Sequence, residues 1–144
     1  MPVTADKDIA RILTDCRSIA LVGASQKLAR PSHRVLQFLL FHGYQVYPVN
    51  PGLAGQDLLG CKVYASLDAI PGNVDMVDVF RQSRYLGGVV SEAISIGAKV
   101  IWTQLDVVDT RAAAVAEQAG LEVVMDRCPA IEIPRLRAAG LMAG

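Results

Sequence analysis

The chain has 144 residues, a length that fits one domain and allows a hydrophobic core to form without disulfides or metals. Hydrophobic residues make up 52% of the sequence and charged residues 19%, which excludes an intrinsically disordered chain. Lys+Arg and Asp+Glu number 14 each, so overall charge predicts binding neither to nucleic acid nor to an anionic membrane. Any phosphate group must therefore be bound by a local site.

The cysteines Cys16, Cys61 and Cys128 are far apart and form no CxxC or Cys/His cluster, which argues against a metal site. Their odd number, together with the absence of an apolar signal segment in residues 1–8, indicates free thiols in a reducing compartment. No apolar run is long enough to cross a bilayer. We therefore expect a cytoplasmic protein without a metal ion.

Apolar residues in the N-terminal half alternate between helical spacing and unbroken runs. Residues 18–24 (SIALVGA) are apolar on both alternating faces, which is typical of a parallel strand buried between two helix layers. Pro31 and Ser32 open a helix that Gly43 ends. The other predicted elements are a helix at 6–15, strands at 45–49 and near 62–64, a loop over 52–60 and a helical turn near 67–70.

The C-terminal half continues this alternation. Asp109 or Thr110 caps an alanine-rich helix that runs to Gln118 and stops at Gly120. The other predicted elements are strands at 76–81, 99–105 and 122–126, a helix at 85–96, and one or two helical turns within 131–139 that begin near Pro134. Alternating strands and helices with short connections predict one α/β domain over 1–144, with a doubly wound, mostly parallel, Rossmann-like sheet in a three-layer α/β/α arrangement.

A sheet of this kind binds ligands at the carboxyl ends of its strands, at the switch in strand order. After the first strand, Gly23 permits a close backbone approach, Ser25 supplies a hydroxyl, and the next helix offers free N–H groups. Arg30 adds a cation suited to phosphate. The pattern predicts a phosphate cradle, with an ordinary tight turn and a capping serine as an equal alternative.

The dinucleotide fingerprint GxGxxG is not met, because the corresponding positions are Gly23, Ser25 and Leu28. The second strand ends in Val49 and Asn50 and lacks the acidic residue that binds the ribose of NAD. These differences argue against NAD and leave open another nucleotide diphosphate.

The motifs IALVGAS, RPS, HGYQVYPVNP, MVDVFR and VVMDRCPAIEIPRL, in this order, closely resemble the small stand-alone CoA-binding domain proteins. They resemble more distantly the N-terminal CoA-binding domain of the succinyl-CoA synthetase α subunit. The resemblance extends from about residue 9 to residue 136. It implies that the ligand is coenzyme A (CoA) or an acyl-CoA.

The resemblance also implies which residues contact this ligand, and all of them lie in or just after three strands. They are Gly23, Ala24, Ser25 and Gln26 for the pyrophosphate, with Arg30 beside it; Val49, Asn50 and Pro51 for the adenosine; and Val79, Phe80 and Arg81 for the groove in which the ligand crosses the sheet edge. An apolar wall with an aromatic ring suits the adenine or the pantetheine arm.

Two positions depart from the family pattern. Relatives commonly carry a Lys where this chain has Gly52, and the lost charge is expected to weaken binding by roughly 1–2 kcal/mol unless Arg30, Arg81 or Lys62 compensates. Relatives usually have a Gly where this chain has Asp106, whose carboxylate would repel phosphate.

No residue pattern predicts catalysis. The sequence lacks a Ser-His-Asp order, HExxH, a Walker loop and GxSxG, and the phosphorylated His of the synthetase α subunit belongs to a domain with no counterpart here. We interpret His33 as a surface or capping residue, and His42 as favourably placed at a helix C-terminus.

We also favour structural roles for the other side chains that could take part in chemistry. Cys128 is interpreted as a buried apolar residue, with thiol exchange as the alternative. Asp78, in a buried strand, needs a partner such as Arg81 or Arg127, and Asp75 is given a similar structural role. We expect Trp102 in the core or an interface, and an exposed or interface pair between Glu132 and Arg135.

Three hypotheses follow. The first is a CoA-binding carrier, sensor or regulatory module without catalysis of its own. The second is an enzyme, either half of a CoA ligase or a thiol-transfer enzyme using Cys128. The third is a protein-interaction module with a vestigial pocket, and a homo-oligomer or an unidentified protein partner remains open.

Overall fold

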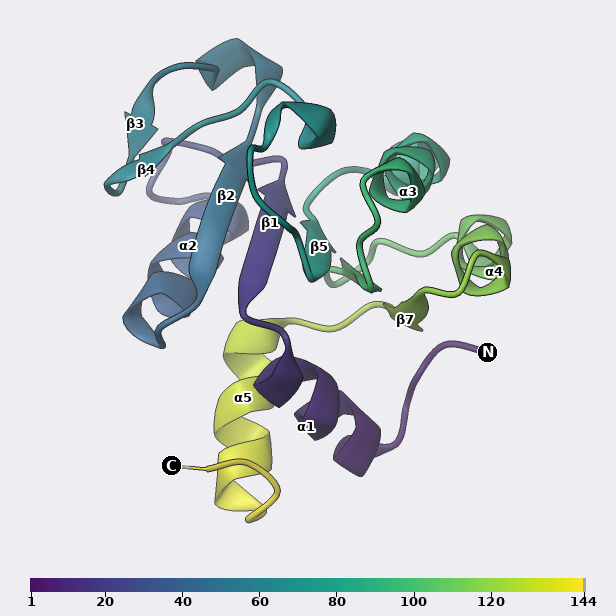
Figure 1. Cartoon of the computed structure of the whole chain (residues 1–144). Helices are drawn as coiled ribbons and strands as arrows, with labels where there is room; N and C mark the ends of the chain where they lie inside the picture. Colours follow the sequence, from purple (N-terminus) through teal and green to yellow (C-terminus); the bar gives the residue numbers. More distant parts are fainter. Residues whose placement is uncertain (144) are drawn as a thin grey trace.

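The computed structural model describes residues 1–143, and its central element is a parallel sheet (Figure 1). Five strands form it: β1 (Ser18–Val22), β2 (Gln45–Val49), β5 (Met76–Val79), β6 (Val100–Thr103) and β7 (Glu122–Val124). Their order is β2-β1-β5-β6-β7, and every neighbouring pair is parallel. The order reverses at β1, so the loops after β1 and β5 diverge to opposite faces and open a crevice there.

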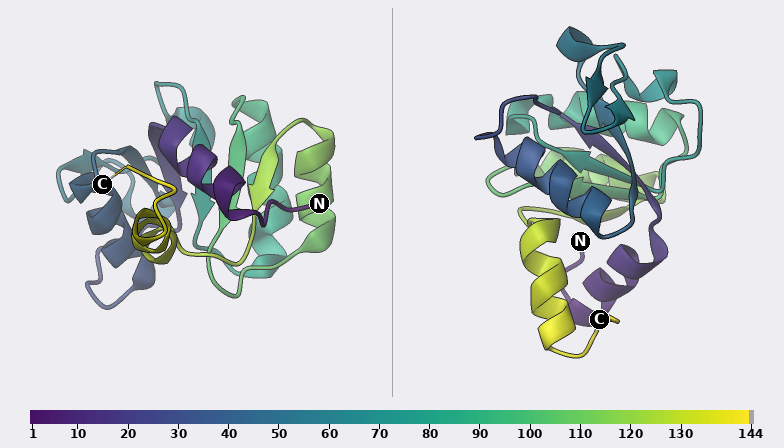
Figure 2. Two further views of the ribbon diagram at one scale, coloured as in Figure 1. Left: turned by 90° about the horizontal axis from the view of Figure 1, so that it is seen from below. Right: turned by 90° about the vertical axis from the view of Figure 1, so that its left-hand side faces the viewer.

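Helices cover both faces of the sheet (Figure 2). One layer contains α1 (Asp6–Asp15), α2 (Pro31–Phe41) and α5 (Pro129–Ala138), and the other contains α3 (Leu86–Ser95) and α4 (Thr110–Gln118). Within β1, Ile19 and Leu21 face the first layer while Ala20 and Val22 face the second, which explains the unbroken apolar run. The predicted α/β/α architecture is confirmed. No helix of residues 1–143 has the length and apolar character to span a bilayer.

The loop predicted over 52–60 contains two elements that were not expected, β3 (Asp57–Leu58) and a 3-10 turn at Pro51–Leu53. β3 pairs antiparallel with β4 (Cys61–Lys62), which overlaps the strand predicted near 62–64. The 3-10 turn at Leu67–Ala69 confirms the helical turn predicted near 67–70, whereas the one at Ser83–Tyr85 was not predicted. Strands of two residues are too short to leave a periodic sequence pattern. Beyond β4, the N–H of Tyr64 donates to Pro48 O at 2.9 Å, and this bond holds the segment that contains β3 and β4 against the edge strand β2.

Helix α5 is longer than predicted, because it starts at Pro129 and contains Pro134 in its interior. Ile133 and Leu136 are buried against the first helix layer, and this burial outweighs the hydrogen bond that Pro134 cannot make. α1 and α5, from opposite ends of the chain, lie side by side in both views (Figures 1 and 2).

The expectation of an exposed or interface pair on α5 was wrong for Glu132, which is only 6% exposed. Its carboxylate accepts hydrogen bonds from Arg127 at 2.9 Å and Arg135 at 2.8 Å, and Arg135 also pairs with Asp6 of α1. These ion pairs tie α5 to α1 and to the loop after β7.

The N-terminal arm, residues 1–5, runs along the edge of the sheet formed by β7. The N–H of Val3 donates to Val123 O at 2.7 Å, and the amino group of Met1 lies 2.8 Å from the carboxylate of Glu117. The arm therefore covers an otherwise open strand edge next to the start of α5.

Candidate functional site

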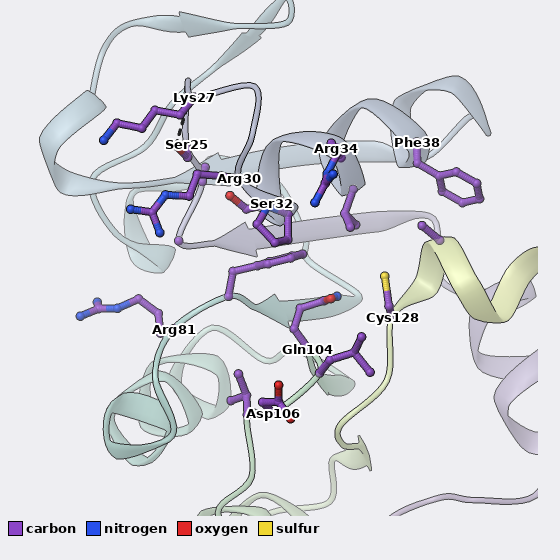
Figure 3. Close-up of a pocket in the computed structure, with 18 of the residues that line it drawn as sticks. Ser25, Lys27, Arg30, Ser32, Arg34, Phe38, Arg81, Gln104, Asp106 and Cys128 are labelled. Carbon is purple, nitrogen blue, oxygen red and sulfur yellow. Dashed lines mark hydrogen bonds between the residues drawn. The ribbon is translucent and has the colours of Figure 1, made fainter.

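A cleft of about 1010 Å³, here called the central cleft, opens at the carboxyl ends of β1, β5 and β6 (Figure 3). α2 and the first turn of α5 form its walls. Its lining residues include Gly23, Ala24, Ser25, Lys27, Arg30, Ser32, Arg34, Phe38, Asn50, Phe80, Arg81, Gln104, Leu105, Asp106, Cys128 and Ile131. This position is the switch in strand order at which the sequence predicts ligand binding.

A second cleft of about 630 Å³, here called the adjacent cleft, lies on the α3 side of the switch. Its lining residues include Val22, Val49, Pro51, Gly52, Ser66, Tyr85, Gly88 and Glu92. Gly23, Asn50 and Arg81 line both clefts, so the two clefts adjoin each other at the sheet edge between β1 and β5.

The backbone conformation and packing of the fold require glycine at position 23, independently of any ligand. Its φ is +93°, and a Cβ there would lie 2.5 Å from the carbonyl oxygen of Phe80. The N–H groups of Gly23 and Ala24 both donate to Val49 O, at 3.0 and 3.2 Å. These two amides are therefore engaged, and the close approach predicted at Gly23 is toward Phe80 of the neighbouring loop.

Polar side chains hold the β1–α2 loop in place. Asn50 donates from Nδ2 to Ala24 O at 2.7 Å and accepts at Oδ1 from the N–H of Gly52 at 2.8 Å. His33 is 5% exposed, and its Nδ1 lies 2.9 Å from Ser25 O. Because a carbonyl oxygen only accepts, Nδ1 carries the proton. His33 is therefore a buried anchor of the loop instead of the predicted surface or capping residue.

Four cations surround the mouth of the central cleft: Lys27, Arg30, Arg34 and Arg81. In residues 1–143, none of them belongs to a salt bridge, although the Arg81 guanidinium stacks 4.2 Å from the ring of Tyr85. Asp106 is the one carboxylate in this lining. The cleft is thus locally positive in a chain of zero net charge.

Lys27 and Arg34 were not among the predicted site residues. Arg30 is the N-cap residue of α2 and Arg34 lies in the first turn of that helix, so a second cation beside the predicted phosphate site was present in the sequence. Lys62, one of the three residues predicted to compensate for Gly52, lies 5.7 Å from the Tyr64 ring and lines neither cleft, whereas Arg30 and Arg81 do.

Most of the residues predicted from the family resemblance line one of the two clefts, but two do not. Gln26 is exposed on the loop beyond the cleft wall. Val79 is fully buried among the core residues on the α3 side, because alternate β5 residues face opposite helix layers. A direct ligand contact is thus not supported for Gln26 or Val79.

The two departures from the family pattern both lie at the clefts. Gly52 lines the adjacent cleft, where a Cβ would lie 3.3 Å from Asn50 Oδ1. Asp106 lines the central cleft with a φ of +69°, a conformation that favours glycine but that Asp tolerates better than most residues. Its N–H donates to Asp126 Oδ1 at 2.7 Å, which holds the loop after β6 to the loop after β7.

Asp78 is fully buried on β5 and has neither of the predicted arginine partners. Its Oδ1 accepts a hydrogen bond at 3.2 Å from Gln104 Nε2, and its Oδ2 has no partner within residues 1–143. Burial raises the pKa of Asp78 to about 7. Gln104 lines the central cleft, so the buried Asp78 carboxyl group fixes the position of a side chain at the floor of the cleft.

Asp75 has the structural role that the sequence predicts. Its carboxylate accepts a hydrogen bond from the N–H of Arg17 at 2.8 Å, just before β1.

Cys128 is 8% exposed and lines the end of the central cleft opposite Lys27 and Arg30 (Figure 3). Burial raises the pKa of its thiol, although the backbone amides of Ala130 and Ile131 act in the opposite direction. The thiol is thus positioned to contact a ligand but is not activated as a thiolate. No cluster of His, Cys, Asp or Glu suited to a metal ion occurs within residues 1–143.

His42 and Trp102 line neither cleft. His42 is the C-cap residue of α2, as predicted; burial, followed by the charge of Arg137, lowers its pKa, so its neutral form is favoured there. Trp102 is fully buried and donates from Nε1 to Arg127 O at 2.8 Å, which confirms its predicted core position.

Comparisons with known proteins agree with this geometry. The uncharacterized protein YneT of Bacillus subtilis is 38% identical over 121 residues, which cover 84% of this chain and 88% of YneT. A hypothetical protein from Pyrococcus horikoshii OT3 has a solved structure that is 42% identical, with a TM-score of 0.89 over 95% of this chain and 96% of that one.

A larger enzyme also contains a similar segment. The α subunit of an ADP-forming acetate–CoA ligase I of Pyrococcus furiosus is 32% identical over 89 residues, or 59% of this chain and 19% of that subunit. A family model described as a CoA binding domain matches residues 17–134. Because this match spans most of the sequence and agrees with the resemblance found in its motifs, the chain belongs to the CoA binding domain family.

Proposed function

We propose that this protein binds CoA or an acyl-CoA across the central and adjacent clefts, and that it catalyses no reaction by itself. The observation that carries the proposal is the group of four cations without salt bridges at the mouth of the central cleft. CoA carries a pyrophosphate and a further phosphate, and unpaired guanidinium groups are well suited to such anions.

The shape of the site supports a long ligand with chemically distinct ends. Adenosine is proposed to occupy the adjacent cleft, against Val49 and Pro51 and beside the Tyr85 ring. The pyrophosphate then lies near Ser25 and Arg30, and the pantetheine arm runs past Gln104 toward Cys128. The shared residue Arg81 stands where this ligand crosses the sheet edge.

The hydrogen bonds of Asn50 argue against NAD as the ligand. NAD-binding sheets of this type place an acidic side chain at this strand end, where it accepts hydrogen bonds from the ribose hydroxyls. Here both ends of the Asn50 amide already bond to Ala24 O and the N–H of Gly52. Asn50 therefore shapes the loops and leaves no carboxylate for the ribose.

Isothermal titration of the purified protein with CoA, NAD and ADP tests the proposal. We expect micromolar or tighter binding of CoA and much weaker binding of NAD and ADP. An absence of heat with CoA, from a protein whose folding is verified by circular dichroism, would contradict the proposed ligand. The rival protein-interaction function predicts instead that a partner is captured equally well with and without CoA.

Thiol transfer is the second candidate function, because Cys128 lines the central cleft. In that reaction the Cys128 sulfur would attack a CoA disulfide, form a protein–CoA disulfide and release the other thiol. The raised pKa of Cys128 opposes it, since the thiolate is the nucleophile. We expect no CoA adduct by mass spectrometry after incubation with CoA disulfide at neutral pH. A stoichiometric adduct that disappears in Cys128→Ser would favour thiol transfer.

A further inference from the structure

A third cavity of about 480 Å³, here called the N-terminal pocket, adjoins the central cleft. The N-terminal arm, the loop after β7 and the first turns of α5 enclose it. Leu105, Cys128 and Ile131 line both the pocket and the central cleft, so the two spaces are continuous. Since Cys128 lies opposite Lys27 and Arg30 in Figure 3, the pocket extends the cleft away from these two cations.

The junction between the two spaces presents apolar side chains to solvent. Leu105 is 52% exposed and Ile131 is 53% exposed, and both point to the same opening. Pro2 and Val3 of the arm continue this surface into the pocket. An apolar group bound there would remove these side chains from water, which is favourable in proportion to the area covered.

The charged groups of the N-terminal pocket already have partners within the protein. Arg127 and Glu132 form an ion pair at 2.9 Å, and Asp126 Oδ1 accepts the N–H of Asp106 at 2.7 Å. The amino group of Met1, which also lines the pocket, lies 2.8 Å from the carboxylate of Glu117, and no further cation lines the pocket within residues 1–143. A negatively charged occupant would therefore find no free partner, whereas an uncharged apolar occupant would disrupt no existing pair.

We infer that the N-terminal pocket binds the acyl group of an acyl thioester of CoA, and that this acyl group is uncharged. The inference rests on the proposed function, because the phosphates of the same ligand occupy the cationic part of the central cleft. The thioester then lies beside Cys128, and the acyl chain passes between Leu105 and Ile131. The ligand of this protein is accordingly an acyl-CoA carrying an apolar chain.

Calorimetric titration with CoA, acetyl-CoA, butyryl-CoA, hexanoyl-CoA and succinyl-CoA tests the inference. Each methylene group that enters the pocket should tighten binding about fourfold. We expect hexanoyl-CoA to bind at least about tenfold more tightly than CoA, and succinyl-CoA no more tightly than acetyl-CoA.

Two substitutions locate the acyl group. Val3→Asp places a charge on the pocket wall, and Thr4→Trp fills the pocket from an exposed position. In each variant the affinity ratio of hexanoyl-CoA to CoA should fall to about one. The matched control Val115→Asp, at an exposed site on α4 outside the three cavities, should keep the wild-type ratio. Thermal unfolding of each variant verifies the fold.

The outcomes separate the inference from the proposed function. Binding of CoA without any gain from the acyl chain overturns the inference and leaves the proposed function intact. A gain that persists in both pocket variants also overturns it, because the chain then binds elsewhere. If neither CoA nor any acyl-CoA binds, the proposed function fails and the inference with it.

Discussion

At the scale of single residues, several positions that resemble ligand contacts are occupied by the protein's own hydrogen bonds. The amides of Gly23 and Ala24 both bond to Val49 O, and Asn50 joins two loops. Residue type alone did not reveal these contacts, because each joins segments that are distant in sequence. The side chains left free for a ligand are the cations, which makes them the most informative to substitute.

Arg30→Ala should weaken CoA binding by about ten- to a hundredfold. Arg30 lines the central cleft without a salt bridge, and a hydrogen bond to a charged group is worth about 1.5–3 kcal/mol. Titration calorimetry measures the change. Arg111→Ala, which removes an exposed arginine of α4 outside the clefts, is the control and should bind like the wild type. Equal affinities for both variants would remove Arg30 from the site.

Substituting Asp106 should tighten CoA binding by about two- to fivefold, because a like charge leaves the wall facing the phosphates. Two variants separate charge from backbone conformation. Asp106→Asn removes only the charge, whereas Asp106→Gly also relieves the residue's φ of +69°. Both should gain affinity at low salt, and the gain should shrink at high salt. Unchanged affinity in both would place the ligand phosphates away from this loop.

At the scale of elements, capping and breaking residues predicted most boundaries. Pro31 opens α2, Asp109 caps α4 by accepting the N–H of Ala112, and Gly43 and Gly120 follow helices with positive φ. These signals act within a few residues, so the sequence displays them directly. β3 was missed because a strand of two residues leaves no periodic pattern, and the first turn of α5 was missed although Pro129 at its first position is itself a local helix-start signal.

In helix α5, packing overrides the local helix-breaking effect of Pro134, and substituting Pro134 tests this explanation. Pro134→Ala restores an N–H that can donate to the carbonyl of Ala130, and we expect a gain of about 1–2 kcal/mol after the greater freedom of the unfolded chain is included. Thermal unfolding should then show a midpoint a few degrees higher. Pro31→Ala, at the first position of α2 where no such bond is lost, should not be stabilising. A lower midpoint for Pro134→Ala would contradict this account.

At the scale of the whole molecule, the buried Asp78 makes stability depend on pH. Burial raises its pKa to about 7 in the folded protein, against an ordinary value of 3.8 for Asp. The folded state thus holds a proton that the unfolded state has released between these pH values, and stability falls as pH rises through this window. We expect urea unfolding to give a lower free energy at pH 8 than at pH 5.

Asp78→Asn should remove most of this pH dependence and raise stability at pH 8, by on the order of 4 kcal/mol if the buried carboxylate ionises there. Asn retains a side-chain oxygen that accepts the hydrogen bond from Gln104. Asp57→Asn, at an exposed position on β3, serves as the control and should leave the slope unchanged. A wild-type slope retained in Asp78→Asn would assign the pH dependence to another group.

The sequence by itself determined the fold class, because strands apolar on both faces and helix-ending glycines are local patterns read in order along the chain. Its family followed from the resemblance of its motifs, which the match over residues 17–134 confirms. The sequence also predicted a candidate site at the strand ends, where the structure has its central cleft, since that rule follows from a parallel sheet. Only the tertiary structure decided which side chains line the clefts, brought Lys27 and Arg34 into the site and withdrew Val79 into the core. It alone joined residues 1–4 to residues 125–132 around a pocket. The physical reason is that a cleft arises where distant segments meet, and a local sequence pattern carries no information about such contacts.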